Sequence, residues 1–506
     1  MKGVIAAGDI LTAKAGAVIL EEGGNAFDAA VAAMLAAPLA EPALTSLGGG
    51  GFLLAVQKGV IPLIYDFFVD VPPKRVEEPD FFPVYVDFGS TVQEFHIGCG
   101  SVAVPGMVAG IKRVHEERGK LPFKKVIEPA IEYARKGIKL SKTQASFVKL
   151  LEPIFTATEE AKSIYAPEGK LIDENTTFKN PDYANFLELL EKEGSLVFYE
   201  GEVADRIDEL CKRNNGLLRK KDLQRYSVDE KDPIYFRFKG FDVFTNSPPS
   251  PGGLLIAFTL KLLEEVNLGK FGSLKHISSL VEAMHTTQIF RRENVDKHIH
   301  GKDIHLILED EALFSVYKSF FSKRLNLWGN TTHISVIDEE LNAVSVTTTN
   351  GEGSGYIIPG TGIMLNNMLG EEDLNPGGFF RWEPYVRLPS MMSPTVVMKE
   401  GDVKLVLGSA GSNRIRSAIL QTVLNYTVFN KTVKESVELP RIHYENHVVY
   451  FEPGFDTEVI NKLSKEFETV VFEEKSLFFG GVQAVTGDFT GAGDPRRGGI
   501  SISVNL

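Results

Sequence analysis

The sequence predicts an α/β (α+β) fold in which two stacked, mainly antiparallel sheets carry helices on their outer faces, a four-layer αββα sandwich. Two runs of alternating polar and apolar residues within 331–349 are typical of a β-hairpin. Other strand-like segments, in 3–56, 231–268, 394–450 and 480–505, alternate with segments of helical periodicity. These two groups of strands and their helices fit the sandwich.

The acidic composition argues against nucleic acid as a binding partner. The 506 residues carry 54 Lys and Arg against 67 Asp and Glu, a net charge of −13. Such a chain lacks the positive surface that phosphate backbones require, so we expect no nucleic-acid partner. The longest apolar run, Ala29–Ala37, is too short to cross a bilayer, and MKGVIAAGDI at the start lacks the apolar core of a signal peptide. We therefore expect a cytoplasmic protein with no membrane partner.

Metal-ligand patterns are incomplete in this sequence. Cys99 and Cys211 are far apart and form neither a metal nor a redox spacing, so we expect buried free thiols. The charged segment 291–330 holds three histidines, namely His298, His300 and His305. No cysteine and no convincing carboxylate joins these imidazoles in a metal site, so the segment is predicted to be a solvated linker. We expect no metal and no cofactor.

Residues 3–56 predict, in order, a strand, a helix, a glycine-rich turn and a second strand. Gly24-Asn25 leads into FDAAVAAMLAA, whose small residues suit close packing of a helix on a sheet. The run LGGGGF, Leu47–Phe52, lacks the Lys-Ser or Lys-Thr of a phosphate-binding loop. It is therefore predicted to be a tight turn that permits close approach of two backbones.

The rest of the chain alternates in the same way. Residues 60–110 are strand-like, and the charged, helically periodic stretch 112–225 predicts a peripheral helical lobe. Residues 231–268 return to strand, loop and helix. Residues 394–450 predict a strand, a turn, a helix over Arg416–Val428 and another strand. Gly480–Asn505 predicts two closing strands.

The hairpin brings two threonines together. Thr331–Asp338 and Ala343–Thr349 both alternate, on either side of a polar turn. If the turn is centred on Glu340, residue i lies opposite residue 680 minus i, which places Thr349 beside Thr331. Directly opposed residues of antiparallel strands have Cβ atoms roughly 4.5–5.5 Å apart. Two hydroxyls are therefore expected to meet at the start of a strand.

This arrangement suits a threonine that becomes an N-terminal nucleophile after the chain is cut. A threonine hydroxyl is a poor nucleophile near neutral pH and needs an adjacent base to accept its proton. If the chain is cut between Asn330 and Thr331, the new α-amine, with a reference pKa of about 7.7–8.0, supplies that base. Thr331 itself can make the cut by attacking the Asn330 carbonyl and releasing the ester to water. The alternative is an ordinary hydroxyl-rich hairpin.

The same residues resemble a known family. TTHISVID followed by NAVSVTTT is similar to the processing-site signature of the gamma-glutamyltranspeptidase family, a branch of the N-terminal-nucleophile hydrolases. Further motifs follow the family's order along nearly the whole chain: Gly3–Ala36, LGGGGF, VPGMVAG (Val104–Gly110), NSPPSPGG (Asn246–Gly253), GIMLNNM (Gly362–Met368), SPTVV (Ser393–Val397), GSAGSNRI (Gly408–Ile415), PRIH (Pro440–His443) and DPRRGG (Asp494–Gly499). The αββα sandwich is also this family's fold.

The resemblance implies a role for each matching residue. Thr331 matches the family's nucleophile, and Thr349 matches the second threonine, which hydrogen-bonds the nucleophile and orients its hydroxyl. His333 is not assigned as a base and is expected to be structural. GSAGSNRI resembles the oxyanion loop, whose usual Gly-Gly pair becomes Gly411-Ser412 here. Because backbone N–H groups bind the oxyanion, the serine is tolerated provided that its φ is negative.

Substrate recognition departs from the family pattern. The arginine that clamps the donor's α-carboxylate follows an Asp-Phe pair in the family, and Phe68 stands in its place here. Where the family has a serine pair that also holds the carboxylate, this chain has Ser390-Met391. Where the family has a glutamine after an Asn-Asn pair, this chain has Met368. Glu371 stands for an aspartate, and Glu371 and Asn350 are expected to contact the donor's α-ammonium. A carboxylate left unpaired in a partly dry pocket is costly, so a strict glutathione-type transpeptidase is in doubt.

The resemblance implies a zymogen that cleaves itself into residues 1–330 and 331–506, two fragments that stay together as one folded heterodimer. The product would transfer a γ-glutamyl or related acyl group from a small-molecule amide to water or an amine. One alternative is an acylase or amidase of the same family with a less polar acyl donor. Another is an unprocessed, non-catalytic homologue that acts as a binding module.

Overall fold

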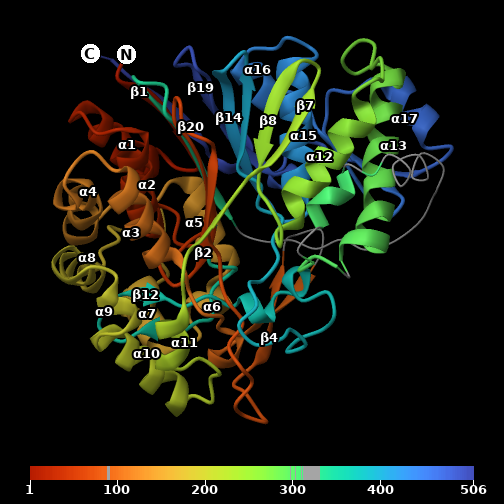
Figure 1. The fold of residues 1–506 in the computed structure, drawn as a ribbon. Coiled ribbons are helices and arrows are strands. Elements are labelled where there is room, and N and C mark those ends of the chain that lie inside the picture. Colours follow the sequence, from red (N-terminus) through yellow and green to blue (C-terminus); the bar gives the residue numbers. More distant parts are fainter. Residues whose placement is uncertain (88–91, 297, 302–303, 309, 311–330, 506) are drawn as a thin grey trace.

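Two stacked sheets form the centre of the molecule (Figure 1). The computed structural model of the chain describes residues 1–87, 92–296, 298–301, 304–308, 310 and 331–505. The first sheet has the order β20-β1-β9-β10-β2-β3-β6. Its strands are β1 (Gly3–Ala7), β2 (Gly50–Val56), β3 (Leu63–Phe67), β6 (Asp229–Lys231), β9 (Thr332–Asp338), β10 (Ala343–Thr349) and β20 (Ile500–Val504). The second sheet has the order β19-β18-β14-β13-β8-β7. Its strands are β7 (Ile234–Phe238), β8 (Phe241–Thr245), β13 (Thr395–Lys399), β14 (Asp402–Ala410), β18 (Gly481–Val485) and β19 (Gly491–Gly493).

Helices cover the outer face of each sheet, which confirms the predicted αββα sandwich. Helices α1 (Ile10–Glu21) and α2 (Ala26–Ala40) pack on the first sheet, and α12 (Pro251–Leu263) and α15 (Arg414–Thr427) pack on the second (Figure 1). The predicted start of α2 is closed by a capping box. The side chain of Asn25 accepts hydrogen bonds from the backbone at the helix start, and Asp28 accepts one from the Asn25 N–H.

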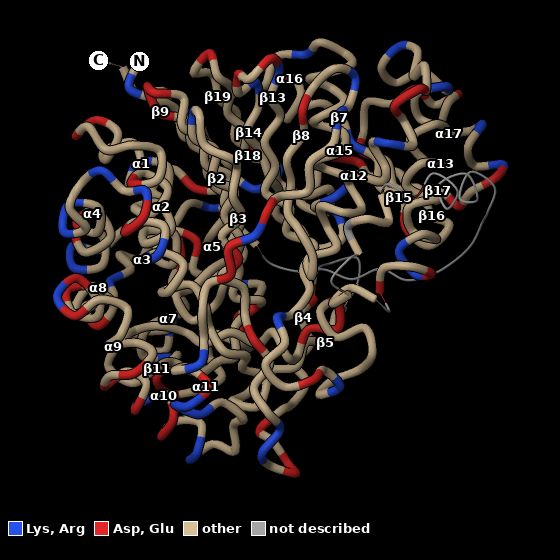
Figure 2. Tube along the Cα trace, in the orientation of Figure 1, with Lys and Arg blue, Asp and Glu red and all other residues tan. Residues whose placement is uncertain are grey.

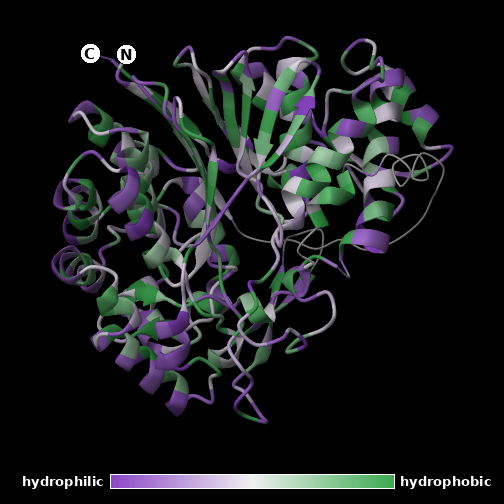
Figure 3. Cartoon of the chain, viewed as in Figure 1, coloured by the Kyte–Doolittle hydropathy of each residue, from purple (hydrophilic) through white to green (hydrophobic). Residues whose placement is uncertain are grey.

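The helical lobe predicted for 112–225 is present, and it packs against the outer helices of the first sheet. Its helices are α3 (Met107–Arg118), α4 (Phe123–Lys136), α5 (Lys142–Leu150), α6 (Glu152–Phe155), α7 (Glu159–Tyr165), α8 (Pro181–Glu193), α9 (Leu196–Tyr199), α10 (Glu202–Arg213) and α11 (Lys220–Arg225). Apolar residues concentrate in the sheets and the helix faces against them, whereas the outside of the lobe is polar (Figure 3).

Shorter elements complete the chain. They are the hairpin β4 (Phe82–Asp87) and β5 (Val92–Ile97), the pair β11 (Ile357–Ile358) and β12 (Ile363–Met364), the small sheet β15 (Ile442–Glu445), β16 (Val448–Phe451) and β17 (Glu468–Val471), the helices α13 (Leu274–Phe290), α16 (Val433–Glu438) and α17 (Thr457–Leu463), and a π-helical turn, Arg291–Val295, after α13. Single turns of 3₁₀ helix lie at Cys99–Ser101, Pro167–Gly169, Ile304–Leu308, Met368–Gly370, Glu372–Leu374, Leu477–Phe479 and Pro495–Arg497.

Four sequence predictions need correction. Residues 3–56 hold two helices rather than one, because Gly23 and Gly24 interrupt the helical run. The C-terminal segment adds three strands rather than two, and α15 begins at Arg414. The described start of segment 291–330 is not a solvated linker. Val295 is fully buried and Ile299 is nearly so, because both pack into the core around α12 and α13.

The hairpin register agrees with the prediction. Strand β10 pairs antiparallel with β9 from Ala343↔Ile337 to Thr348↔Thr332, and the next pair in this register is Thr349 with Thr331. The glycine run at the start of β2 makes a close approach, as expected. A Cβ atom on Gly49 would lie 2.1 Å from the Thr349 carbonyl oxygen. Both β9 and β10 are buried along their whole length, since helices cover one face and the second sheet covers the other.

Lys, Arg, Asp and Glu residues concentrate on helices and loops at the periphery, and few belong to the two sheets (Figure 2). Within the described residues, no helix is long and apolar enough to span a membrane. The same part of the chain contains no group of three or more His, Cys, Asp and Glu side chains arranged to hold a metal ion.

Candidate active site

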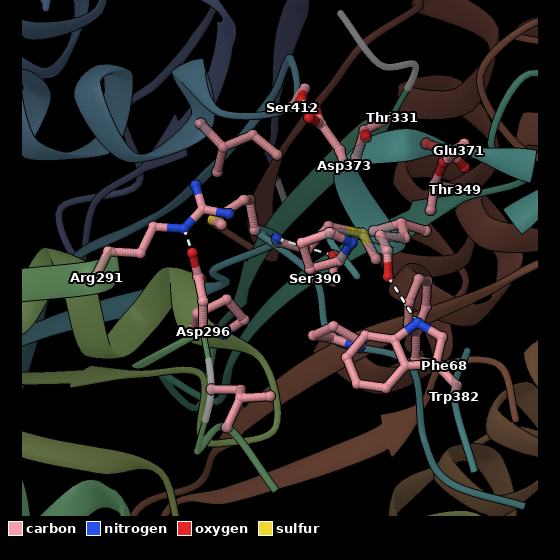
Figure 4. A pocket seen from close by; sticks show the side chains of 18 residues that line it. Phe68, Arg291, Asp296, Thr331, Thr349, Glu371, Asp373, Trp382, Ser390 and Ser412 are labelled. Carbon is pink, nitrogen blue, oxygen red and sulfur yellow. Dashed lines mark hydrogen bonds and ion pairs between the residues drawn. The ribbon is translucent and has the colours of Figure 1, made fainter. Parts of the chain in front are cut away.

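A pocket lies at the open end of the β9–β10 hairpin, beside Thr331 and Thr349 (Figure 4). The first sheet contributes Thr331 and Thr349, and the second contributes residues just before β13 and just after β14. Seven of the residues singled out from the sequence line this pocket: Phe68, Thr331, Thr349, Glu371, Ser390, Met391 and Ser412. Gly411, Asn350 and Met368 lie outside its lining, and Asn330 lies outside the described residues.

Thr331 and Thr349 are nearly buried, with 5% and 6% of their surfaces exposed. The hydroxyl oxygen of Thr349 accepts a hydrogen bond of 3.0 Å from the backbone N–H of Gly351. A hydroxyl that accepts in this way can donate its own hydrogen to a second oxygen. Because Thr331 is the opposed residue in the register, its hydroxyl is suitably placed to accept it.

A buried carboxyl anchors the strand that starts at Thr331. Glu41, at the end of α2, accepts hydrogen bonds from the hydroxyls of Thr12, at 2.7 Å, and Thr332, at 2.6 Å. On the opposite strand, the Thr45 and Thr348 hydroxyls are 3.0 Å apart. The start of β9 and the end of β10 are therefore both hydrogen-bonded to the segment between α2 and β2. None of these five residues was assigned a role from the sequence, because each contact joins segments that are distant in the chain.

Burial, and then the charge of the nearby Asp9, raise the pKa of Glu41 from 4.5 to about 7. Between about pH 4.5 and 7 the folded state therefore binds more protons than the unfolded state, and the free energy of unfolding falls as pH rises. The full effect of this group is about 3 kcal/mol. We expect Glu41→Gln, which keeps the shape and one hydrogen bond of the neutral carboxyl, to flatten this part of the profile. Urea unfolding of both proteins from pH 4 to 8 tests this, and equal slopes would contradict it.

His333 is structural, as expected. Its Nδ1 lies 2.7 Å from the Thr347 hydroxyl and its Nε2 lies 2.9 Å from the Ser335 hydroxyl. Complete burial lowers its pKa to about 3, so the ring is neutral at physiological pH. Both ring nitrogens are occupied within the sheet interface, and His333 does not line the pocket.

The turn between β14 and α15 differs from its prediction. Gly411 has φ +117° and Ser412 has φ +51°, so the condition of a negative φ at Ser412 is not met. The chain must reverse from the last residue of β14 into α15 within three residues, and the left-handed conformation at Ser412 makes this possible. Such a conformation costs a non-glycine residue about 1 kcal/mol. The Ser412 hydroxyl donates to Asp373, which helps to hold the turn.

Glu371 lies beside Thr349 in the pocket (Figure 4). Its Oε1 is buried and has no hydrogen-bond partner among the described residues. Burial, then the neighbouring carboxyl groups of Glu352 and Asp373, raise the pKa of Glu371 well above its usual range. The raised pKa favours the protonated carboxyl, and a positive charge that approaches Glu371 favours the carboxylate. Asn350, also expected to contact the donor's ammonium, does not line this pocket, and its buried Oδ1 has no hydrogen-bond partner in the described part of the chain.

The position after Asp66-Phe67 presents an aromatic ring to the pocket. The Phe68 carbonyl accepts hydrogen bonds from the Tyr226 hydroxyl, at 2.6 Å, and from the Arg387 guanidinium. Arg387 also pairs with Asp70, at 3.1 Å, and does not line the pocket. The Arg387 charge is therefore paired outside the pocket, next to the backbone of Phe68. The Phe68 ring faces the pocket and forms part of a mainly apolar wall. That wall contains Phe68, Leu374, Trp382, Met391, Met392 and Ile415.

Sequence reasoning missed the charged wall. Arg291 and Asp296 line the pocket across from Thr349 and Glu371 (Figure 4). The Arg291 Nε donates to Asp296 at 2.9 Å, and its Nη1 donates to Asn413 at 3.1 Å. The charge density of 291–330 is visible in the sequence, where it favours a solvated segment and not a pocket wall. No local pattern shows that the end of α13 packs against the start of α15.

Comparisons with known proteins concern the whole chain and its fold. A family model described as Gamma-glutamyltranspeptidase matches residues 12–504. The glutathione hydrolase proenzyme of Bacillus subtilis is 29% identical and aligns over 100% of this chain and 92% of its own. The capsule biosynthesis protein CapD proenzyme of Bacillus anthracis is 31% identical over 98% of this chain and 89% of its own. The crystal structure of cephalosporin acylase from Bacillus halodurans has the same fold, with a TM-score of 0.88 over 100% of this chain and 96% of that chain, at 23% identity.

Proposed function

The chain belongs to the gamma-glutamyltranspeptidase family of enzymes, and we propose that it is a self-processing amidohydrolase and acyltransferase with Thr331 as its nucleophile. Cleavage after Asn330 frees the α-amine of Thr331, which accepts the hydroxyl proton as Thr331 attacks an amide carbonyl. The acyl group then passes from Thr331 to water or to an amine. The observation that carries the proposal is that Thr331 and Thr349, which continue the register of the hairpin on opposite strands, line one pocket.

The other groups of the pocket suit this chemistry. Thr349 donates its hydrogen to the Thr331 hydroxyl and holds that oxygen toward the carbonyl. The backbone N–H groups of Gly411 and Ser412 precede the 14-residue helix α15. The N-terminal end of a helix carries partial positive charge, which favours an oxyanion that develops there. The turn has positive φ at Gly411 and Ser412, and the Ser412 hydroxyl donates a hydrogen bond to Asp373. These features fix the N–H groups of Gly411 and Ser412 before substrate binds.

Two fragments, residues 1–330 and 331–506, would then share one core. Strands β1, β2, β3 and β6 precede the cleavage point, and β9, β10 and β20 follow it, yet all seven belong to one sheet. Separation of the fragments would expose that sheet, so we propose that they remain a heterodimer. The relatives named proenzymes support a precursor that is cut before it acts.

Trapping the acyl-enzyme tests the proposal. We expect that incubation with a γ-glutamyl anilide, followed by an acid quench within the first turnover, adds the mass of one acyl group to the peptide that begins at Thr331. Addition of alkaline hydroxylamine should remove it, because hydroxylamine cleaves an oxygen ester at alkaline pH and leaves an amide intact. An acyl group on any other residue, with full turnover, would exclude Thr331 as the nucleophile.

Glu371 supports a donor that carries an ammonium group, as a γ-glutamyl compound such as glutathione does. Its buried, unpaired Oε1 lies in the pocket beside Thr349. A bound ammonium favours the carboxylate, so binding removes a proton from the raised-pKa Glu371. Below the pKa of the free carboxyl, each pH unit of increase should strengthen binding by up to tenfold. Affinity for such a donor should therefore rise with pH.

We expect Glu371→Gln to raise KM for a γ-glutamyl anilide about 10- to 100-fold, because it removes a hydrogen bond to a charged group. The rise of affinity with pH should disappear in the variant. The matched control is an acyl anilide without an ammonium group, whose KM should be the same in both proteins. An equal KM increase for both substrates would mean that Glu371 has only a structural role.

A second candidate function is favoured by the apolar wall. Phe68, Met391 and Trp382 face the pocket where the family's arginine would clamp a carboxylate. An acylase with a less polar donor would bury its acyl chain against these side chains. Steady-state kinetics with γ-glutamyl anilide and simple acyl anilides separate the two functions. A higher kcat/KM for the simple acyl substrates would favour the acylase, and a higher value for γ-glutamyl anilide would favour the first function.

A further inference from the structure

The two cysteines of the chain touch each other. The Sγ atoms of Cys99 and Cys211 are 3.4 Å apart, although 112 residues separate them in the sequence. Both side chains are fully buried, and both are free thiols in this structure. A buried residue typically touches 6–12 others, so two unrelated buried residues of a chain of 506 would touch by chance in about 5% of cases or fewer. The contact therefore calls for an explanation beyond the tendency of cysteine to be buried.

We propose that Cys99 and Cys211 form a disulfide bond that ties the helical lobe to the segment supporting the substrate pocket. Cys99 lies in the 3₁₀ turn after β5, and Cys211 lies in α10. An S–S bond of about 2.05 Å requires the sulfurs to approach by a further ~1.4 Å. Gly216 keeps the space between the two segments narrow, because a Cβ atom there would lie 2.6 Å from the Cys99 Sγ.

The surrounding contacts already hold the two segments together. The Cys99 N–H donates to the Asp80 carboxylate at 2.9 Å, and the Asp80 N–H donates to the Asn215 carbonyl at 3.2 Å, four residues after Cys211. Gly216 closes the same turn with an N–H that donates to the Cys211 carbonyl at 2.7 Å. The backbone thus brings the sulfurs together without a bond, and the bond would lock an arrangement that is already formed.

The Cys99 segment also reaches the pocket. Ala103, four residues after Cys99, donates its N–H to the Asn366 side chain at 3.1 Å and accepts a hydrogen bond from it at 3.0 Å. Asn366 in turn accepts from the Met368 N–H at 3.2 Å, three residues before Glu371. The cross-link would therefore limit local opening of the loop that carries Glu371 as well as global unfolding.

Formation of the bond requires an oxidant, which we take to be a low-molecular-weight disulfide such as oxidised glutathione. The thiolate of one cysteine attacks a glutathione sulfur and releases one glutathione thiol, leaving a mixed disulfide. The second thiolate attacks the protein sulfur of this mixed disulfide and releases the second glutathione thiol. The protein loses two hydrogens, and the glutathione disulfide gains them. Since both sulfurs are buried, exchange should occur while the chain folds or unfolds, and slowly in the native state.

The test compares one protein in two redox states. The full-length protein is unfolded and refolded in buffer with excess oxidised glutathione or with dithiothreitol, quenched in acid, alkylated under denaturing conditions and mapped without reduction. We expect the peptides that contain Cys99 and Cys211 to be cross-linked after oxidation, with a Tm about 3 °C or more above that of the reduced protein. The double variant Cys99→Ser/Cys211→Ser should show one Tm under both conditions.

Any of the following results would overturn the proposal. The first is alkylation of both cysteines as free thiols after refolding with oxidised glutathione. The second is a pair of mixed disulfides with glutathione and no cross-linked peptide. The third is a cross-linked protein whose Tm does not exceed that of the reduced form, or a redox shift of equal size in the double serine variant. The main comparison is between the oxidised and reduced forms of the unsubstituted chain. It can therefore be interpreted even if the double serine variant does not fold.

Discussion

Thr331→Ala should leave the chain whole and reduce hydrolysis of any anilide substrate by at least about a thousandfold. The reason is that one hydroxyl performs both steps. It attacks the Asn330 carbonyl during processing, and it attacks the substrate carbonyl afterwards. Denaturing electrophoresis and initial rates measured on the same preparation give both readings.

Thr331→Ser is the matched control, because serine keeps a hydroxyl and an α-amine and loses only a methyl group. We expect it to be processed, more slowly than the unsubstituted chain, and to retain measurable activity. The melting temperature of the alanine variant must stay close to that of the serine variant for the comparison to report on chemistry. A cleaved Thr331→Ala chain, or one with unchanged turnover, would remove this mechanism.

Thr349→Val should lower kcat about a hundredfold with a small change in KM. Valine keeps the shape and burial of threonine but removes the hydroxyl that accepts from Gly351. We propose that the same hydroxyl donates to Thr331. Loss of the orienting hydrogen bond lets the nucleophile leave its attack geometry, and such misplacement typically costs about 10²-fold. Initial rates over a range of substrate concentration separate kcat from KM.

The neighbouring Thr348→Val variant controls for loss of a hydroxyl in the same strand. Thr348 points to the other face of β10, where its hydroxyl contacts Thr45 at 3.0 Å. We expect Thr348→Val to lower the melting temperature and to leave kcat within a factor of about three. If Thr348→Val lowered kcat as much as Thr349→Val, the effect would come from the stability of the hairpin and not from orientation of Thr331.

The hairpin and its threonine pair were predictable because their signals are local. Alternation along Thr331–Asp338 and Ala343–Thr349 specifies which side chains share a face, and the polar turn between them fixes the register. Once the register is fixed, the opposition of Thr331 and Thr349 follows by counting. The glycines of LGGGGF were predictable for the same reason, since only close backbone contact explains such a run.

The remaining parts of the site depend on packing between distant segments. Arg291 reaches the pocket because the end of α13 meets Asn413 at the start of α15, and no periodicity in either segment encodes that meeting. The φ of Ser412 is determined by the reversal between β14 and α15, which the residue type alone does not reveal. Glu41 and Thr332 are 291 residues apart, and Cys99 and Cys211 are 112 apart. Each of these contacts exists only in the folded chain.

Denaturing mass spectrometry of freshly purified protein tests the central claim most directly. We expect two fragments, one ending at Asn330 and one beginning at Thr331, whose masses add to that of the 55.7 kDa chain plus one water. This result would establish the free α-amine that the chemistry of Thr331 requires. A single species of 55.7 kDa that persists through long incubation, in a preparation that still turns over substrate, would contradict an N-terminal threonine mechanism.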